Sequence, residues 1–332
     1  MLKISDLLKK IKANKFLILG RAGADIYPEP PGTKTEFAKY YVTHLGGSSA
    51  NISVALTRLG GACSICTCVS DDALGRYVLN QLNDYGVNTS LIRSIKGNVR
   101  VSFAVVESTV EDHQSIIYRN GAADLYMNVD DINKINFNNF SCLIVTGTTL
   151  ALEPSRSATF EAIRLAKMNG LSIFLDIDYR PYTWKSPEEA ANVYLKAGKL
   201  CDVLIGNDYE FGVMAGDYDK GFNLSKELSK SNCCIVVYKM GEKGSIAFVE
   251  NTMIKTGIFN VKVLKPTGAG DAFMGTFIAS LLNDKNIKDS IIYGSAAAAI
   301  VVTKVGCSVA MPNLIELEQF VNNKEIINFQ ES

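Results

Sequence analysis

Short apolar runs rich in β-branched residues alternate with helical patterns along most of the chain. Helical periodicity covers Ala158–Asn169, for example, and Gly170 follows it as a stop signal. This alternation predicts an α/β fold with a mostly parallel sheet and helices on both faces. The expected strands include 16–19, 142–145, 172–175, 203–205 and 235–237. Leu and Ile at positions 4, 7, 8 and 11 predict a short amphipathic helix near the start.

Two segments break the alternation, at about 22–45 and 97–120. Neither contains a good helical pattern, and 99–105 alternates with a period of two residues. These segments predict a small β lid that projects from the main sheet. A pair of ordinary surface hairpins is the alternative.

Charge and cysteine content narrow the class of protein. Lys plus Arg and Asp plus Glu both number 34, so no global field favours nucleic acid or an anionic membrane. The first residues are too charged for a secretory signal, and no apolar run approaches the roughly 18 residues of a membrane span. We therefore expect a reducing, cytoplasmic location for a protein with eight Cys. Cys63, Cys66 and Cys68 are interpreted as core residues, because a metal site would need a second ligand pair and His is scarce.

Polar residues or glycine follow each expected strand. In a mostly parallel sheet, ligands collect at the carboxyl ends of the strands. Five such ends in one chain predict a shared polar cleft. The segments concerned are 20–25, 146–147, 176–180, 206–210 and 239–241.

The most informative motif is the glycine-containing turn of residues 265–271, which precedes an apolar helical face. Gly268, Ala269 and Gly270 lie at a predicted helix N-terminus, where unpaired amides and the helix dipole favour phosphate. Asp271 in the first turn suits a base that takes a proton from an attacking hydroxyl while the amides hold a phosphoryl group. The alternative is an aspartate that only stabilises the helix dipole.

A second motif is a glycine pair before a predicted helix. Gly46 and Gly47 would let a sugar approach the backbone, and Ser48 or Ser49 would cap the helix. Asn51 in the first turn could reach a polyol. An ordinary capped helix is the alternative.

A third motif follows the strand at 203–205. Asn207 and Glu210 are three residues apart and could hold the water shell of Mg²⁺. A capping pair for the next helix is the alternative. No Walker A sequence is present, and 20–25 lacks the dinucleotide-binding spacing.

Together these motifs resemble the ribokinase-like (PfkB) family of sugar kinases, over about residues 16–312. The segments 46–60 and 265–273 carry the resemblance. It implies a single domain over 1–332, a three-layer α/β/α sandwich with a β lid, ATP and Mg²⁺ as partners, and possible pairing of lids into a homodimer. The roles it implies are a base (Asp271), an anion hole (amides of Gly268, Ala269 and Gly270), contacts to Mg-ATP (Asn207, Glu210), sugar ligands (Asp25, Gly46, Gly47, Asn51) and nucleotide contacts (Lys239, Gly241, Gly244, Thr267 and the 296–300 helix with Ala298).

Several loops are most similar to family members that phosphorylate 5-dehydro-2-deoxygluconate, a sugar acid of inositol catabolism. These loops are 20–28, 115–127, 146–151, 176–184 and 263–271. Kinases of 2-keto-3-deoxygluconate or fructose are the near alternatives, and a non-catalytic sugar-binding regulator is the alternative of another class. Asp178 stands where related 2-keto-3-deoxygluconate kinases have Asn.

A substrate carboxylate calls for an arginine, whose planar fork binds carboxylates with two hydrogen bonds. Arg21, Arg119 and Arg180 each fall in a loop expected near the cleft. We place Arg119 or Arg180 ahead of Arg21 for this contact.

One position departs from the resemblance. Many family members have Asp six positions before the base, where it helps to bind a monovalent cation, and this chain has Lys265. An ammonium group would repel potassium and could replace its charge. The hypothesis is that the protein is not activated by potassium.

Overall fold

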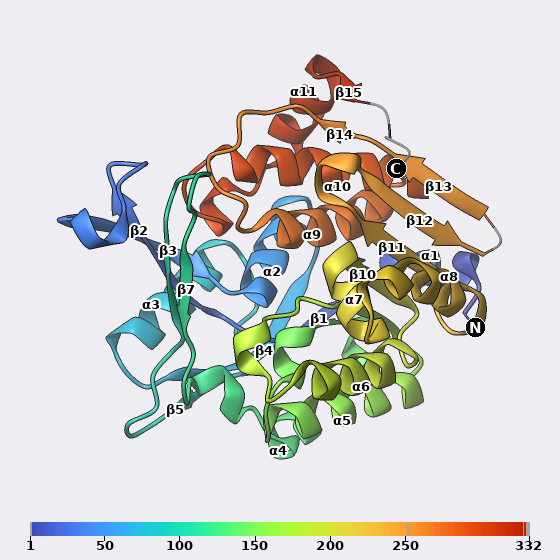
Figure 1. Cartoon of the computed structure of the whole chain (residues 1–332). Coiled ribbons are helices and arrows are strands. Elements are labelled where there is room, and N and C mark those ends of the chain that lie inside the picture. Colours follow the sequence, from blue (N-terminus) through green and yellow to red (C-terminus); the bar gives the residue numbers. More distant parts are fainter. Residues whose placement is uncertain (1, 251, 328, 330–332) are drawn as a thin grey trace.

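The computed structural model describes residues 2–250, 252–327 and 329. A nine-stranded sheet runs through the middle of the molecule (Figure 1), in the order β13-β12-β11-β10-β9-β8-β1-β4-β5. In that order the strands are Thr252–Thr256, Ser245–Val249, Ile235–Lys239, Val203–Asn207, Ser172–Asp176, Cys142–Thr146, Phe16–Leu19, Cys63–Ser70 and Ile92–Ile95. The seven strands from β11 to β5 are parallel, which confirms the expected sheet. β12 and β13 add an antiparallel edge that the alternation did not predict.

Helices cover both faces of this sheet. One face carries α1 (Ile4–Lys12), α2 (Ser48–Arg58), α3 (Ala73–Asp84), α9 (Ala269–Leu282), α10 (Ile287–Val302) and α11 (Leu314–Asn323). The other carries α4 (Val129–Asn133), α5 (Ser155–Met168), α6 (Pro187–Gly198), α7 (Asp208–Ala215) and α8 (Gly221–Ser231). Central strands such as β1 are apolar throughout because successive side chains enter opposite cores: Phe16 and Ile18 pack in one, Leu17 and Leu19 in the other. The three-layer α/β/α architecture is therefore confirmed.

The structure also confirms two smaller expectations. The amphipathic first helix is α1, which buries Leu7 and Ile11. All eight cysteines are buried with free thiols, as in the core-packing interpretation. Within the described residues no helix has the length and apolar character to cross a bilayer. The cytoplasmic location stays a prediction.

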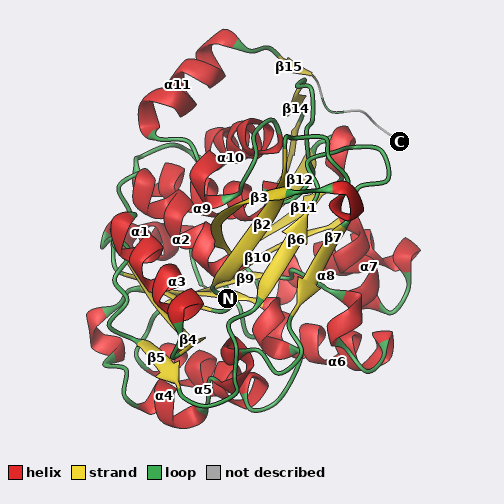
Figure 2. Cartoon of the chain, turned by 90° about the vertical axis from the view of Figure 1, so that its left-hand side faces the viewer, coloured by secondary structure: helices red, strands yellow, loops and turns green. Residues whose placement is uncertain are grey.

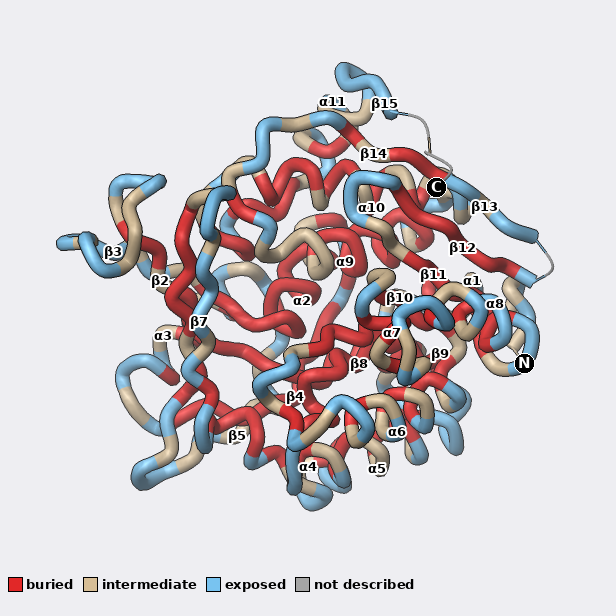
Figure 3. Tube along the Cα trace, in the orientation of Figure 1, coloured by how far each residue is buried: buried red, intermediate tan, exposed pale blue. Residues whose placement is uncertain are grey.

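A separate four-stranded sheet is built from the two segments that broke the alternation. Its order is β3-β2-β6-β7, with bounds Tyr40–Gly46, Gly23–Glu29, Phe103–Val106 and Ser115–Tyr118. Figure 2 shows this sheet in front of the main one, and Figure 3 shows that β7 and the far end of β3 are largely exposed. Its use as a lid stays a prediction. A last short pair, β14 (Ile258–Phe259) and β15 (Ile326–Ile327), lies beside α10 and α11 (Figure 1).

Candidate active site

A cleft of about 920 Å³ lies at the carboxyl ends of the parallel strands and reaches the small sheet. Asp176 ends β9, Asn207 ends β10 and Lys239 ends β11, and all three line it. The small sheet contributes alternate residues, including Asp25 and Ile117. Every site residue expected from the sequence lines this cleft, except Gly46 and Gly47.

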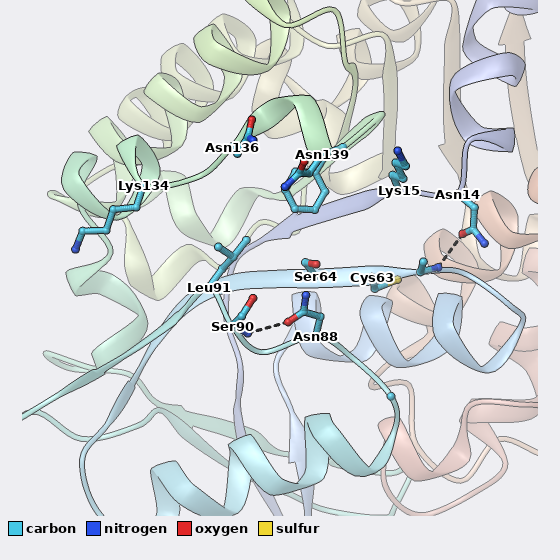
Figure 4. A pocket seen from close by; sticks show the side chains of 13 residues that line it. Asn14, Lys15, Cys63, Ser64, Asn88, Ser90, Leu91, Lys134, Asn136 and Asn139 are labelled. Atoms are coloured by element: carbon cyan, nitrogen blue, oxygen red, sulfur yellow. Dashed lines mark hydrogen bonds between the residues drawn. The ribbon is translucent and has the colours of Figure 1, made fainter.

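A second hollow, of about 550 Å³, lies at the opposite edge of the sheet, at the amino ends of β1 and β4 (Figure 4). Its polar lining is mainly amide and hydroxyl side chains with two lysines, and its described residues include no carboxylate and no arginine. Two of its asparagines are already engaged, since Asn14 accepts from the amide of Ala62 and Asn88 from that of Ser90. The described lining of this hollow has no carboxylate or imidazole to act as a base, so the carboxyl-end cleft is the candidate active site.

The amino terminus of α9 opens into the cleft. Gly268 is its N-cap and has a positive φ of 88°, a conformation that glycine adopts without strain. No side chain caps this helix end. The first amides, at Ala269 and Gly270, therefore point toward the cleft without intrahelical partners, which is the arrangement that binds phosphate.

Asp271 lies in the first turn of α9 and is partly buried, with its carboxyl lining the cleft. Burial raises the pKa of its carboxyl to about 7, and the nearby Asp178 carboxylate also raises it. A hydrogen bond from Asn51 and the charges of Arg180 and Arg21 act in the opposite direction. A carboxyl with a pKa near neutrality is matched to proton transfer at physiological pH.

Asn51 holds this carboxyl in place. Its Nδ2 donates to Asp271 Oδ2 at 2.8 Å. The hydroxyl of Ser308 lies 2.8 Å from Asn51 Oδ1 and fixes which way the amide points. The structure shows Asn51 bound to the candidate base, and its expected contact with a sugar stays a prediction.

The glycine pair has a different surrounding from the one expected. A Cβ on Gly46 would lie 2.1 Å from the carboxyl of Asp25, and one on Gly47 would lie 2.4 Å from the carbonyl oxygen of Arg21. The close approach that these glycines allow is therefore between protein segments, and neither lines the cleft. The expected serine cap is wrong: Gly47 is the N-cap of α2 without a side-chain bond, and Ser49 Oγ instead donates to the carbonyl of Leu19.

Two of the three candidate arginines are already paired with carboxylates. Arg119 Nε donates to Asp124 Oδ2 at 2.8 Å, and both side chains are buried. Arg180 lies 2.6 Å from Asp178. These partners neutralise much of the charge that was expected to attract a substrate carboxylate.

Arg21 differs from the other two. It is buried, and in the described structure its guanidinium donates one hydrogen bond, from Nη1 to Ser102 Oγ at 3.2 Å, with no carboxylate in ion-pair contact. Near it are buried polar atoms without protein partners: Asp25 Oδ1, Asp178 Oδ2 and Arg119 Nη1. Unpaired buried polar atoms are costly. Their presence around one cleft fits a polar ligand that supplies their hydrogen bonds.

Asn207 and Glu210 form a capping box at the start of α7, which is the alternative stated for this motif. Asn207 Oδ1 accepts from the amide of Glu210 at 2.8 Å, and Glu210 Oε2 accepts from that of Asn207 at 2.7 Å. Glu210 Oε1 also accepts from the amide of Tyr179. Carboxylate oxygens have further lone pairs, so this cap does not prevent contact with a hydrated cation.

Asp176 completes the oxygen-rich part of the cleft. Its carboxyl makes no hydrogen bond in the described structure, and burial raises its pKa well above the ordinary value, with the Lys239 charge opposing. The described residues contain no cluster of three or more His, Cys, Asp or Glu able to hold a metal directly. Oxygen atoms of Asp176, Asn207 and Glu210 do fit Mg²⁺ that keeps its waters.

The rest of the cleft is suited to a nucleotide. Lys239 places its ammonium 5.5 Å from the Phe273 ring centre, near Gly270 and the open end of α9. Gly241, Gly244, Thr267 and Ala298 line this part. The surrounding side chains are mostly apolar, as an aromatic base requires: Ile258, Phe259, Val261, Val263 and Val302.

Ser308 contacts Asn51 and Asp176 lines the cleft, and the sequence patterns assigned no role to either residue. Ser308 is 257 positions from Asn51, and no local pattern connects the two. Asp176 did have a signal, because it is the first charged residue after a buried strand.

Comparison with known proteins identifies the family to which this chain is similar. Residues 14–314 match the family described as pfkB family carbohydrate kinase. A 5-dehydro-2-deoxygluconokinase of Photobacterium profundum is 36% identical over 315 residues, covering 93% of this chain and 95% of the relative. One from Clostridium beijerinckii is 36% identical over 333 residues, covering 96% and 97%.

Solved structures show the same fold. A putative ribokinase II of E. coli in complex with ATP and Mg²⁺ superposes with a TM-score of 0.82 at 22% identity, covering 93% of this chain and 99% of its own. A fructokinase double mutant of Vibrio cholerae with fructose, ADP and potassium ion bound has a TM-score of 0.79 at 26% identity, with coverage of 93% and 98%. The ribokinase-like resemblance of the sequence is confirmed.

Proposed function

Because this chain belongs to the pfkB family of carbohydrate kinases, we propose that it transfers the γ-phosphoryl group of ATP to the terminal hydroxyl of 5-dehydro-2-deoxy-D-gluconate. The observation that carries the proposal is the pairing of Asp271 with the uncapped amino terminus of α9 in one cleft with three arginines. The kinase relatives at about 36% identity support the sugar acid as substrate.

Asp271 is the general base in this proposal. Its Oδ1 accepts the hydroxyl proton while Asn51 holds Oδ2, and the freed oxygen forms a bond to the γ-phosphorus as the bond to the β-phosphate oxygen breaks. The amides of Gly268, Ala269 and Gly270 stabilise the charge on the moving phosphoryl group. ADP leaves with the negative charge of the broken bond, and Lys239 lies where it meets the phosphates.

Mg²⁺ would be held through water by Asp176, Asn207 and Glu210. When bound, it neutralises phosphate charge and helps to orient the phosphates. Gly241, Gly244, Thr267 and Ala298 would contact the nucleotide.

Arg21 is the residue to which we assign the substrate carboxylate, with Arg119 Nη1 as a second donor. Arg119 and Arg180 are neutralised by Asp124 and Asp178, whereas Arg21 has no carboxylate in ion-pair contact in the described structure. A buried guanidinium gains most from an anion that completes its pairing. Asp25 and Asp178 would accept bonds from sugar hydroxyls through their unpartnered oxygens.

The small sheet is assigned two functions in this proposal. Its inner face would close over the sugar and exclude water, which limits hydrolysis of ATP. Its outer face would pair with a second copy of the chain. Tyr41, Ile116 and Tyr118 share that outer face in the strand register and are 42%, 41% and 50% exposed.

A coupled assay of ADP release tests the function. The purified chain is given Mg-ATP with 5-dehydro-2-deoxygluconate, 2-keto-3-deoxygluconate, fructose or a nucleoside, and the highest kcat/KM is expected for the first. Asp271→Asn should lower kcat by about 10²–10⁴-fold with an unchanged Tm, because it removes a general base and keeps the hydrogen-bonding shape. Preference for another acceptor would reassign the substrate, and no ADP release with any sugar acid would favour the non-catalytic regulator.

A further inference from the structure

Lys265 is a charged side chain that the protein encloses completely. Its exposed fraction is 0%, which for lysine is rare, because removing an ammonium group from water is costly. No carboxylate lies within ion-pair distance of it in the part of the chain that the structure describes. Such a group persists only where its surroundings satisfy it, so its contacts indicate what it does.

Those contacts join the anion-hole turn to a distant loop. Lys265 Nζ donates to the carbonyl oxygen of Thr267 at 2.7 Å, directly before Gly268. It also lies 3.7 Å from Cys307 Sγ. Burial raises the pKa of the Cys307 thiol to about 11, so the sulfur is neutral and does not cancel the lysine charge.

The turn itself is packed against that loop. A Cβ on Gly268 would lie 2.7 Å from Cys307 Sγ, so Gly268 and Cys307 are in close contact. The carbonyl of Thr267 and the amide of Gly268 belong to one trans peptide, so they point in opposite directions. The ammonium group gives that carbonyl a partner and fixes this orientation.

We propose that Lys265 is a built-in monovalent cation that positions the anion hole, and that it takes the place of a dissociable potassium ion. The inference rests on the proposed function of the α9 amides. One fructokinase with the same fold was solved with a potassium ion bound. A site that already contains a buried ammonium group does not fit a second monovalent cation, because the two charges repel in a region shielded from water.

The wild-type protein supplies the first test, which needs no variant. ADP release is measured with saturating Mg-ATP and the sugar acid in NaCl and in KCl at equal ionic strength. The kcat values are expected to agree within about twofold. A several-fold increase in KCl would overturn the proposal.

Variants supply the second test. Lys265→Met keeps the length of the side chain without its charge, and it should lower kcat/KM for ATP by about 10- to 100-fold, as small displacements of catalytic groups do. The matched control is Lys262→Met, an exposed lysine three positions earlier that should leave kcat/KM unchanged. Activity of Lys265→Met equal to that of the control would overturn the proposal.

Chemical rescue separates a charge effect from a packing effect. Lys265→Ala opens space for a small cation. Ammonium, methylammonium or potassium should therefore raise the kcat/KM of this variant for ATP by about tenfold or more, and tetramethylammonium should not. Affinity for Mg-AMP-PNP, measured by calorimetry with and without ammonium, gives the same comparison without any sugar. If the sugar assay alone fails, the proposed substrate is rejected. If the affinity for the nucleotide changes neither on loss of Lys265 nor on addition of ammonium, the built-in cation is rejected.

Discussion

At the scale of single residues, the proposed role of Asp271 as the base makes a prediction about the pH dependence of catalysis. Burial raises the pKa of this carboxyl to about 7 in the free protein. A base must be unprotonated to accept the hydroxyl proton, so activity is present above the pKa and lost below it. We expect kcat/KM for the sugar acid to fall about tenfold per pH unit below pH 7 and to be level above it.

A pH series from 5.5 to 9 at saturating Mg²⁺, with Tm recorded at each pH, is the measurement. The thiol of Cys307 and the phenol of Tyr27 do not produce this loss of activity below pH 7, because burial raises the pKa of both groups above their ordinary values. A profile that stays flat down to pH 5.5 would contradict Asp271 as the base.

The arginines make separate predictions because their partners differ. Arg21→Gln should raise KM for the sugar acid by about 10- to 100-fold with a smaller change in kcat, since a charge-assisted hydrogen bond contributes about 1.5–3 kcal/mol. Arg119→Gln should instead lower Tm, because it leaves the Asp124 carboxylate buried without its partner. Steady-state kinetics and thermal unfolding distinguish the two outcomes.

Arg100→Gln is the matched control, because the side chain of Arg100 is 64% exposed and should change neither quantity. A neutral acceptor such as fructose adds a second comparison, in which the effect of Arg21→Gln should disappear. An unchanged KM for the sugar acid in Arg21→Gln would refute the assignment of Arg21.

At the scale of elements, the start of α9 makes a prediction about glycine. Gly268→Ala places a Cβ against Cys307 and imposes strain at a φ of 88°. The strain alone costs about 1–2 kcal/mol. The displaced turn should in addition lower kcat by about 10²-fold or more, because the amides no longer face the phosphoryl group.

Gly216→Ala is the comparison for strain without displacement. Gly216 ends α7 with a φ of 69°, and a Cβ added there would have no atom within 4 Å. In urea unfolding, Gly216→Ala should lose only the stability that the strain costs and should keep kcat. Gly268→Ala, whose Cβ also meets Cys307, should lose more stability and should lose kcat. Equal kcat values would remove the anion-hole function from this turn.

Elements also show how far prediction from the sequence extends. Strand and helix types followed from periodicity, because burial on both faces of the sheet makes central strands such as β1 continuously apolar. The glycine turn before α9 could also be predicted, because its residues are contiguous in the sequence. The pairing of Arg119 with Asp124, five positions away, and of Arg180 with Asp178 depends on loop conformations that periodicity does not encode.

Contacts between distant segments could not be predicted for a different reason. Asn51 meets Asp271 across 220 positions, and Lys265 meets Cys307 across 42. Each contact exists only once the sheet has brought the segments together. The motifs therefore identified most of the charged residues lining the cleft, but they did not predict the contact between Asn51 and Asp271, and they ranked Arg21 last.

At the scale of the whole molecule, the small sheet has two unlike faces. Asp25, Ala104 and Ile117 point into the cleft, and the alternate residues point away from it. On the outer face the Phe103 and Tyr118 rings stack at 4.7 Å, beside exposed Ile116. Pairing with another surface buries an apolar outer face of this kind and so lowers the free energy.

Pairing through the outer faces predicts a dimer of twice 36.1 kDa in light scattering after size exclusion. The double variant Ile116→Lys/Tyr118→Lys should convert it to a monomer, because two like charges meet their copies across the interface. Met253→Lys, at a residue that is 50% exposed on the main sheet, should leave the dimer intact. Each copy in the dimer keeps a complete site, because the inner face of each small sheet still points into its own cleft. A wild-type protein that is monomeric at all concentrations would show that the outer face is not a contact between copies.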